Sequence, residues 1–278
     1  MTLVSKTYGK ARVRVLRLKK DGPRHEVREL TVQAMMTGDF AGAFVAADNS
    51  KMVSTDTVKN VINVVAREHL GLDTERFCCA VADKLLACYP QVETVTVTAH
   101  ETKWDRLSVG GTPHDHSFLL DGNGKPFARV VASREGKEIT SGLSGFTFMK
   151  TTASAWDNYA LDPYTTIKET RDRICATSME ASWRWSAAPA DFKAANATIL
   201  TTLLDVFAST FSESVQDSLY RMGTAALAKV PELIDISMAC PNKHYLLMNL
   251  EPFGLDNDNL VFLPTDEPHG QIECTVGR

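Results

Sequence analysis

The chain has 278 residues, a length that predicts roughly two domains at about 150 residues each. Its composition is 44% apolar and 23% charged, with 16 glycines and 11 prolines, which is typical of a globular protein and excludes disordered and collagen-like chains. The 30 basic and 34 acidic residues leave a formal net charge of -4. Because binding to nucleic acid needs a basic excess on the protein, we expect neither DNA nor RNA as a partner.

Neither a membrane protein nor a disulfide scaffold is expected. No apolar run approaches the ~20 residues that span a bilayer, and the N-terminal segment lacks the apolar stretch of a signal peptide, so we expect a cytoplasmic protein with no membrane partner. The six cysteines form no C-x-x-C pair, which favours reduced and mostly buried thiols over a zinc cage. These residues are Cys78, Cys79, Cys88, Cys175, Cys240 and Cys274.

The N-terminal part of the chain is predicted to be a β-hairpin. Residues 12–18 alternate basic and apolar side chains, and the alternation changes phase at Val15-Leu16. This pattern predicts a strand with one solvent-exposed face and a bulge at the phase change. Gly22-Pro23 predicts the turn, and residues 26–36 are expected to form the second arm.

Two helices and further strands are predicted to follow. From residue 54 the apolar side chains recur at helical spacing, with a cap expected among residues 54–56 and a stop at Gly71. A second helix is expected to start at Asp73 and to end at Pro90. The strands expected next cover residues 92–98, 104–109, 116–120 and 127–131, with glycine turns at 110–111 and 122–124.

The second half repeats this order of elements. Extended segments are expected at residues 146–149 and 181–185, helices at 192–211 and 214–230, and strands at 233–238 and 245–250. A weak echo of Thr57-Val58-Lys59 in Thr166-Ile167-Lys168 also favours duplication. We therefore expect an α+β protein of two tandem halves, joined between Val131 and Ser144, with antiparallel sheets that carry helices on one face.

Spacing alone proposes few chemical sites. His114-Asp115-His116 can place two imidazoles on the same face of a strand, as metal sites do, but no third ligand is evident nearby, so a hydrogen-bonded pair is the favoured interpretation. Residues 162–173 are predicted to begin a helix at Pro163, with Arg173 about two turns in and Glu169 as its ion-pair partner. Core packing is predicted for Trp183, Trp185 and Phe192.

A set of short motifs in a fixed order resembles the urate oxidase (uricase) family over almost the whole chain. In the first half these motifs are Tyr8-Gly9-Lys10, Ala47-Asp48-Asn49-Ser50, Thr55-Asp56-Thr57-Val58-Lys59-Asn60 and His114-Asp115-His116-Ser117-Phe118. In the second half they are Leu143-Ser144-Gly145, Tyr164 to Thr170, Ser214-Val215-Gln216, Pro241-Asn242-Lys243-His244-Tyr245 and Cys274-Thr275-Val276-Gly277-Arg278. Each motif is short, and the ordered set is specific.

The resemblance implies the tunnelling fold, or T-fold, with tandem halves at residues 1–138 and 139–278. Each half would be an antiparallel four-stranded sheet with two helices, and four chains would stack into a barrel around a tunnel. In this family the active sites lie between subunits, so the implied partners are urate, dioxygen and other copies of the chain in a homotetramer. An isolated monomer is then expected to be inactive.

The resemblance also implies how the substrate is held. Arg173 and Gln216 would grip one edge of the urate ring, because a guanidinium can make two parallel charge-assisted hydrogen bonds to an anionic purine. Backbone groups near Val215, with Thr55 and Asp56 of a neighbouring chain, would hold the other edges. The remaining implied contacts are Ile167 beside the ring, Trp156 or alternatively Tyr159 stacked on it, and Asn242 with Thr55 around the oxygen.

The implied reaction converts urate, dioxygen and water into 5-hydroxyisourate and hydrogen peroxide, without flavin, haem or metal. Lys10 and Thr55 of one chain and His244 of another resemble the proton relay of the family. A desolvated lysine releases its proton more readily, and a histidine exchanges protons near neutral pH. Without the resemblance, structural roles are the favoured interpretation of the same residues, such as a helix cap at Thr55 or a turn residue at Asn242.

Two other functions stay open. The first is a T-fold enzyme acting on another purine or a pterin, in which His114 and His116 would bind zinc. The second is a purine-binding relative that has the fold but no turnover.

Overall fold

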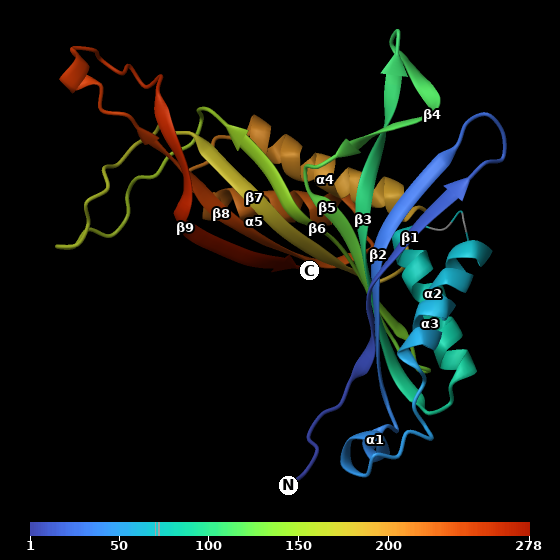
Figure 1. Cartoon of the computed structure of the whole chain (residues 1–278). Helices are drawn as coiled ribbons and strands as arrows, with labels where there is room; N and C mark the ends of the chain where they lie inside the picture. Colours follow the sequence, from blue (N-terminus) through green and yellow to red (C-terminus); the bar gives the residue numbers. More distant parts are fainter. Residues whose placement is uncertain (70, 72) are drawn as a thin grey trace. The chain divides into compact units, whose positions relative to one another are not determined.

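The computed structural model describes residues 1–69, 71 and 73–278. Its contacts form two compact units, which are described one at a time (Figure 1). The first unit consists of Met1–Gly142 and Arg184–Lys193, and the second of Leu143–Trp183 and Ala194–Arg278. Across these residues no helix is both long and apolar enough to cross a membrane.

The first unit is built on an antiparallel sheet in the order β1-β2-β3-β5, with β4 added to β3. The strands are β1 (Tyr8–Lys19), β2 (Glu26–Gly38), β3 (Val92–Val109), β4 (Thr112–Asp121) and β5 (Lys125–Ala132). The hairpin of β1 and β2 confirms the prediction, and residues 92–98 and 104–109 belong to one long strand. The expected junction between Val131 and Ser144 is also largely strand, because β6 (Lys137–Lys150) runs through it.

The bulge in β1 is not where the sequence pattern predicted it. Val15 and Leu16 pair regularly with β2, whereas the register shifts between Lys10 and Val13, where Arg12 has a φ of 58°. The apparent phase change has another cause, because Arg17 is buried and Leu16 is exposed. A charged side chain therefore occupies a position at which the alternation of β1 calls for an apolar residue.

Two capped helices cover the first sheet. Ser54 accepts a hydrogen bond from the Asp56 amide to cap α2 (Thr55–Glu68), and Asp73 accepts one from the Arg76 amide to cap α3 (Thr74–Cys88). The helix α2 ends at Glu68, before the predicted stop. The buried core between helices and sheet includes Val58, Ile62, Phe77, Val81, Leu85, Leu30, Val32 and Val97. A short helix, α1 (Ala41–Val45), precedes them.

The second unit also combines a sheet with two helices, which confirms the α+β class. Its strands are the C-terminal part of β6, then β7 (Cys175–Trp185), β8 (Leu233–Leu247) and β9 (Phe262–Gly277), with α4 (Phe192–Ser209), η1 (Glu251–Phe253) and α5 (Val215–Lys229). The strand β9 pairs antiparallel with β8. The helix α5 packs closely on β9, since a Cβ at Gly223 would lie 2.7 Å from the Val276 side chain.

The prediction of a helix that begins at Pro163 is wrong. Residues 157–169 have no regular secondary structure, and the Asp162 carboxylate accepts hydrogen bonds from the Tyr164 amide at 2.8 Å and the Thr165 hydroxyl at 3.0 Å. Such local bonds offer the backbone an alternative to a helix. The predicted Glu169–Arg173 pair is absent from the described residues too, because Glu169 instead accepts from the Asn158 amide.

Candidate functional site

In the first unit, Lys10, Thr55 and Asp56 lie at the start of β1 and the start of α2. Lys10 is half-buried beside the β1 bulge, and Thr55 and Asp56 are exposed in the first turn of α2. The pKa of Asp56 lies below its usual value, chiefly because Lys59 donates a hydrogen bond to the carboxylate, and the charge of Lys10 adds to the effect. Lys10 therefore interacts electrostatically with the same helix start.

Ser54, rather than Thr55, caps α2. The hydroxyl of Ser54 accepts from the Asp56 amide at 3.2 Å, so the Thr55 hydroxyl is not needed for the cap. The structural role considered for Thr55 is thus filled by its neighbour. The exposed Thr55 side chain is therefore not committed to the cap.

In the second unit, two arginines of the segment before β7 differ in their partners. Arg171 pairs with Asp157 at 2.6 Å and with Glu213 at 3.1 Å. Arg173 donates its backbone amide to the Ser154 carbonyl at 3.2 Å, but its buried Nε has no hydrogen-bond partner among the described residues. Burial lowers the pKa of Arg173, with Cys175 opposing the shift. Arg173 is therefore the arginine with hydrogen-bonding capacity left for a ligand.

The helix α5 begins beside this segment. Ser214 accepts from the Asp217 amide at 3.1 Å and so satisfies one of the first amides of the helix. Val215 is buried and Gln216 is exposed, and their amides occupy the first two helical positions, which have no intrahelical acceptor. A helix N-terminus of this kind favours an anionic ligand.

Trp156 and Tyr159 form a stacked pair. Their ring centroids are 5.5 Å apart with an interplanar angle of 17°, and the Tyr159 hydroxyl donates to the Ile167 carbonyl at 2.8 Å. Backbone hydrogen bonds between Trp156 and Thr170 fix the segment, and the Ile167 side chain is 57% exposed. The structure thus brings the two alternative stacking residues and Ile167 together.

Asn242 and His244 lie on β8, where the register with β9 shifts between them. Asn242 is buried, and its side-chain oxygen has no hydrogen-bond partner within the described chain. Asn242 and Val215 both line a cavity of about 20 Å³, which is space for roughly one water-sized molecule. His244 is half-buried. A buried amide oxygen without a partner is what a ligand-binding asparagine would show before its ligand arrives.

Sequence reasoning missed Ser154 and Ser214 as supports of this segment. The serine pair Ser154 and Ser212 forms a β-bridge that joins the segment before β7 to the chain before α5. The spacing of Ser214 and Asp217, a hydroxyl residue three before an acid, is a signal that could have found the cap. Ser154 has no comparable local signal.

The histidine pair has aromatic neighbours. The rings of His114 and His116 are 4.5 Å apart edge to face, and His25 lies 5.8 Å from His116. Among the described residues no three His, Cys, Asp or Glu side chains are grouped as metal ligands.

The cysteines are free thiols in the structure. Three are buried, as predicted, whereas Cys79 and Cys274 are half-buried and Cys88 is exposed. Burial raises the pKa of Cys240 to about 12, so this thiol is neutral and a poor nucleophile.

Comparison with known proteins identifies the family. The family model described as Uricase matches residues 6–131 and 139–273. Uricases of Arthrobacter globiformis and Cyberlindnera jadinii are each 37% identical, over 98% and 100% of this chain and 88% and 97% of their own. The Arthrobacter globiformis uricase structure superposes with a TM-score of 0.95 over 100% of this chain and 95% of its own, at 37% identity. The chain belongs to the uricase family.

Proposed function

We propose that this protein oxidises urate with dioxygen and water to 5-hydroxyisourate and hydrogen peroxide, without flavin, haem or metal. Two electrons leave urate, dioxygen takes them with two protons to become peroxide, and the oxygen of water becomes the 5-hydroxyl group. Membership of the uricase family over nearly the full length carries this proposal. Its location in the cytoplasm stays a prediction from the sequence.

The substrate would be held in the second unit. Urate is an anion at neutral pH, and the unpaired Nε of Arg173 and the start of α5 are the kinds of group that bind anions. In this proposal Gln216 and the Val215 backbone complete the polar edge. Trp156 or Tyr159 would cover one face of the ring, with the exposed Ile167 beside it.

The proton chemistry would combine groups of both units. Lys10 and Thr55 would pass the urate proton between them, and His244 would accept or return it. The Asn242 amide, whose buried oxygen lacks a partner, would hold dioxygen and then water together with Thr55. Holding both reactants in place lowers a reaction barrier by several kcal/mol.

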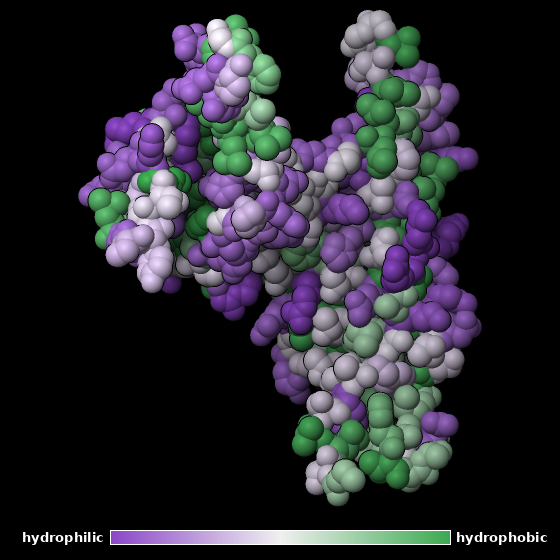
Figure 2. Space-filling view, turned by 60° about the vertical axis from the view of Figure 1, so that its left-hand side comes forward, coloured by the Kyte–Doolittle hydropathy of each residue, from purple (hydrophilic) through white to green (hydrophobic). Residues whose placement is uncertain are grey.

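We propose that the active protein is a homotetramer of T-fold chains, with halves at residues 1–138 and 139–278 and with sites that use the first half of one chain and the second half of another. Exposed apolar side chains support contacts between chains. They include Phe44 and Val45 in α1, and the lower end of Figure 2, near α1 in Figure 1, shows a concentration of apolar surface. Among the described strands, β1 and β9 each have one edge without a pairing strand, which assembly would protect.

The activity is tested by following urate absorbance, oxygen uptake and peroxide release together, with and without a strong chelator. We expect equal molar amounts of urate and oxygen consumed and peroxide formed, unaffected by the chelator. Loss of activity with the chelator would support the zinc-dependent alternative at His114 and His116. Urate binding without oxygen uptake would support the non-catalytic alternative.

A further inference from the structure

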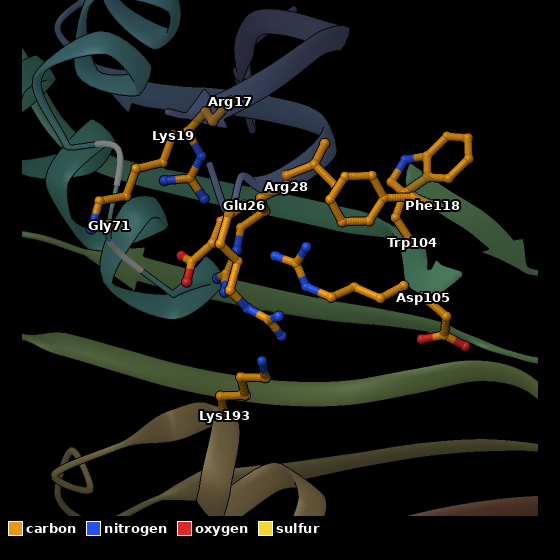
Figure 3. Close-up of a pocket in the computed structure, with 12 residues that line it drawn as sticks. Arg17, Lys19, Glu26, Arg28, Gly71, Trp104, Asp105, Phe118 and Lys193 are labelled. Atoms are coloured by element: carbon orange, nitrogen blue, oxygen red, sulfur yellow. The ribbon is translucent and has the colours of Figure 1, made fainter. Parts of the chain in front are cut away.

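The first unit contains a strongly basic cavity of about 360 Å³ (Figure 3). Its charged lining consists of six basic side chains and two acidic ones, a formal net charge of +4 within a chain of net charge -4. These side chains are Arg17, Lys19, Arg24, Arg28, Arg106, Lys193, Glu26 and Asp105. None of the residues assigned to urate oxidation lines this cavity.

Arg17 is the buried part of the lining. Its side chain comes from the core-facing side of β1 and is 3% exposed. It donates from Nη1 to the His69 carbonyl at 3.0 Å and lies 4.6 Å from the centre of the Phe77 ring. Its Nε and Nη2 have no partner in the described part of the chain. A buried cation with two unused donors destabilises the fold unless a ligand or a protein carboxylate supplies hydrogen-bond acceptors and negative charge.

The nearby carboxylates of the protein do not neutralise the charge of Arg17. Burial, followed by the positive charge of Arg28, lowers the pKa of Arg17 to about 10, against weaker opposing effects that include Glu101 and Asp73. Asp73 already binds Arg76 at 2.6 Å, and Glu101 accepts from Thr74 at 3.1 Å. The cavity therefore has a deficit of negative charge.

Two further cations of the lining have side chains without a hydrogen-bonding or ion-pair partner in the described chain. Within the described chain, the side chains of Arg28 and Lys193 have no hydrogen bond or ion pair, and Figure 3 shows Lys193 directed into the cavity from the start of α4. Arg106 is fixed instead, because it donates to the carbonyls of His25, His114 and Asp115. The site thus combines a buried guanidinium group, a hydrogen-bonded one and basic side chains that lack partners in the described chain.

We propose that this cavity is a binding site for a multiply charged oxyanion of the phosphate type. Guanidinium groups bind such oxygens in pairs, and a lysine adds a point charge. The ligand would supply acceptors for Nε and Nη2 of Arg17 and would offset the repulsion between Arg17 and Arg28. This assignment is independent of urate oxidation.

Calorimetric titration tests the site on the full-length protein without urate. Inorganic phosphate, sulfate and pyrophosphate are titrated at constant ionic strength, with sodium chloride as the balancing salt. We expect saturable binding of one anion per chain. If pyrophosphate binds more tightly than phosphate, the ligand has more than one phosphoryl group, and equal binding of phosphate and sulfate indicates a single tetrahedral anion. Absence of saturable binding by all three anions would overturn the proposal.

Two pairs of substitutions test whether the anion binds in this cavity. The double variant Arg28→Gln with Lys193→Gln removes two unpaired cations and is expected to weaken anion binding about tenfold or more. Lys125→Gln with Lys229→Gln removes two exposed cations outside the cavity and serves as the control for net charge. We expect the control pair to bind as the parent does. Equal weakening in both pairs, or in neither, would overturn the assignment.

Arg17→Met provides a second measurement, because methionine retains an unbranched apolar chain beside Phe77. In the parent, the anion should raise the thermal unfolding midpoint, and in Arg17→Met this rise should be lost. A full anion-dependent rise in the variant would contradict the role of Arg17. If this variant does not fold, the Arg28 and Lys193 pair decides alone.

Discussion

Replacing Arg173 with alanine is expected to weaken urate binding about a hundredfold. The guanidinium of Arg173 has an unpaired buried Nε and would make two charge-assisted hydrogen bonds to the urate anion. At about 1.5–3 kcal/mol for each such bond, the loss is at least ~3 kcal/mol, and each 1.4 kcal/mol corresponds to a factor of ten in the dissociation constant. The measurement is calorimetric titration with urate under argon, where binding is separated from oxidation.

Arg171→Ala is the matched control for this prediction. Arg171 lies two residues away on the same segment, but Asp157 and Glu213 already occupy its guanidinium. We expect the dissociation constant of urate to change less than about threefold, since exposed ion pairs contribute little. Near-ultraviolet circular dichroism checks that both variants are folded. If Arg171→Ala weakens urate binding as much as Arg173→Ala does, or if Arg173→Ala binds urate as tightly as the parent, the role given to Arg173 is wrong.

The other predictions concern the relay, the helix cap and the pH dependence of stability. Lys10→Met and Thr55→Ala should each lower kcat by about a hundredfold and the anaerobic urate affinity far less, because a relay acts on proton transfer; an equal loss in affinity would speak against a relay. Ser214→Ala removes the cap of α5 and should lower the free energy of unfolding by about 1 kcal/mol in urea titrations, and no change would show that the cap is dispensable. A hydrogen bond from Arg14, as the largest cause, lowers the pKa of Glu29, so the stability that Glu29 contributes is fully present above its unfolded pKa near 4.5 and is lost as the pH falls through its lower folded pKa. Glu29→Gln should therefore lose less stability than the parent between about pH 5 and pH 3, and identical acid profiles would contradict this.

Local sequence signals predicted the capped parts of the fold well. Ser54 and Asp73 are followed by amides that they cap, and the apolar spacing after each was enough to place α2 and α3. Capping and amphipathic spacing act within a few residues, so a single sequence contains them. The core positions of Trp183, Trp185 and Phe192 were also predicted correctly, since all three are buried.

The errors arose where distant residues override a local pattern. The sequence of β1 suggests a bulge at Val15-Leu16, but the pattern reflects the burial of Arg17 against Phe77, a residue of another element. The strand β9 was missed because Pro264, Pro268 and Gly270 interrupt its alternation, and only its pairing with β8 makes it a strand.

The candidate site shows the same limit. Arg173 was placed on a helix by the threonines and proline before it, whereas side-chain bonds to Asp162 give that segment a turn instead. The residues named for urate binding came from motifs in the order typical of the family. Spacing alone would not have joined Trp156, Arg173 and Asn242, because they are far apart in the sequence and no local pattern links them.

Mixing two impaired variants tests directly whether each site is built from two chains. Thr55→Ala damages the first half of a site and His244→Ala the second half, so each variant alone should keep only a small residual activity. After the two are unfolded and refolded together, random assembly should restore urate oxidation at about a quarter of the sites. A mixture as inactive as its components, with hybrid tetramers demonstrated by differently tagged chains, would show that Thr55 and His244 of the same chain serve one site.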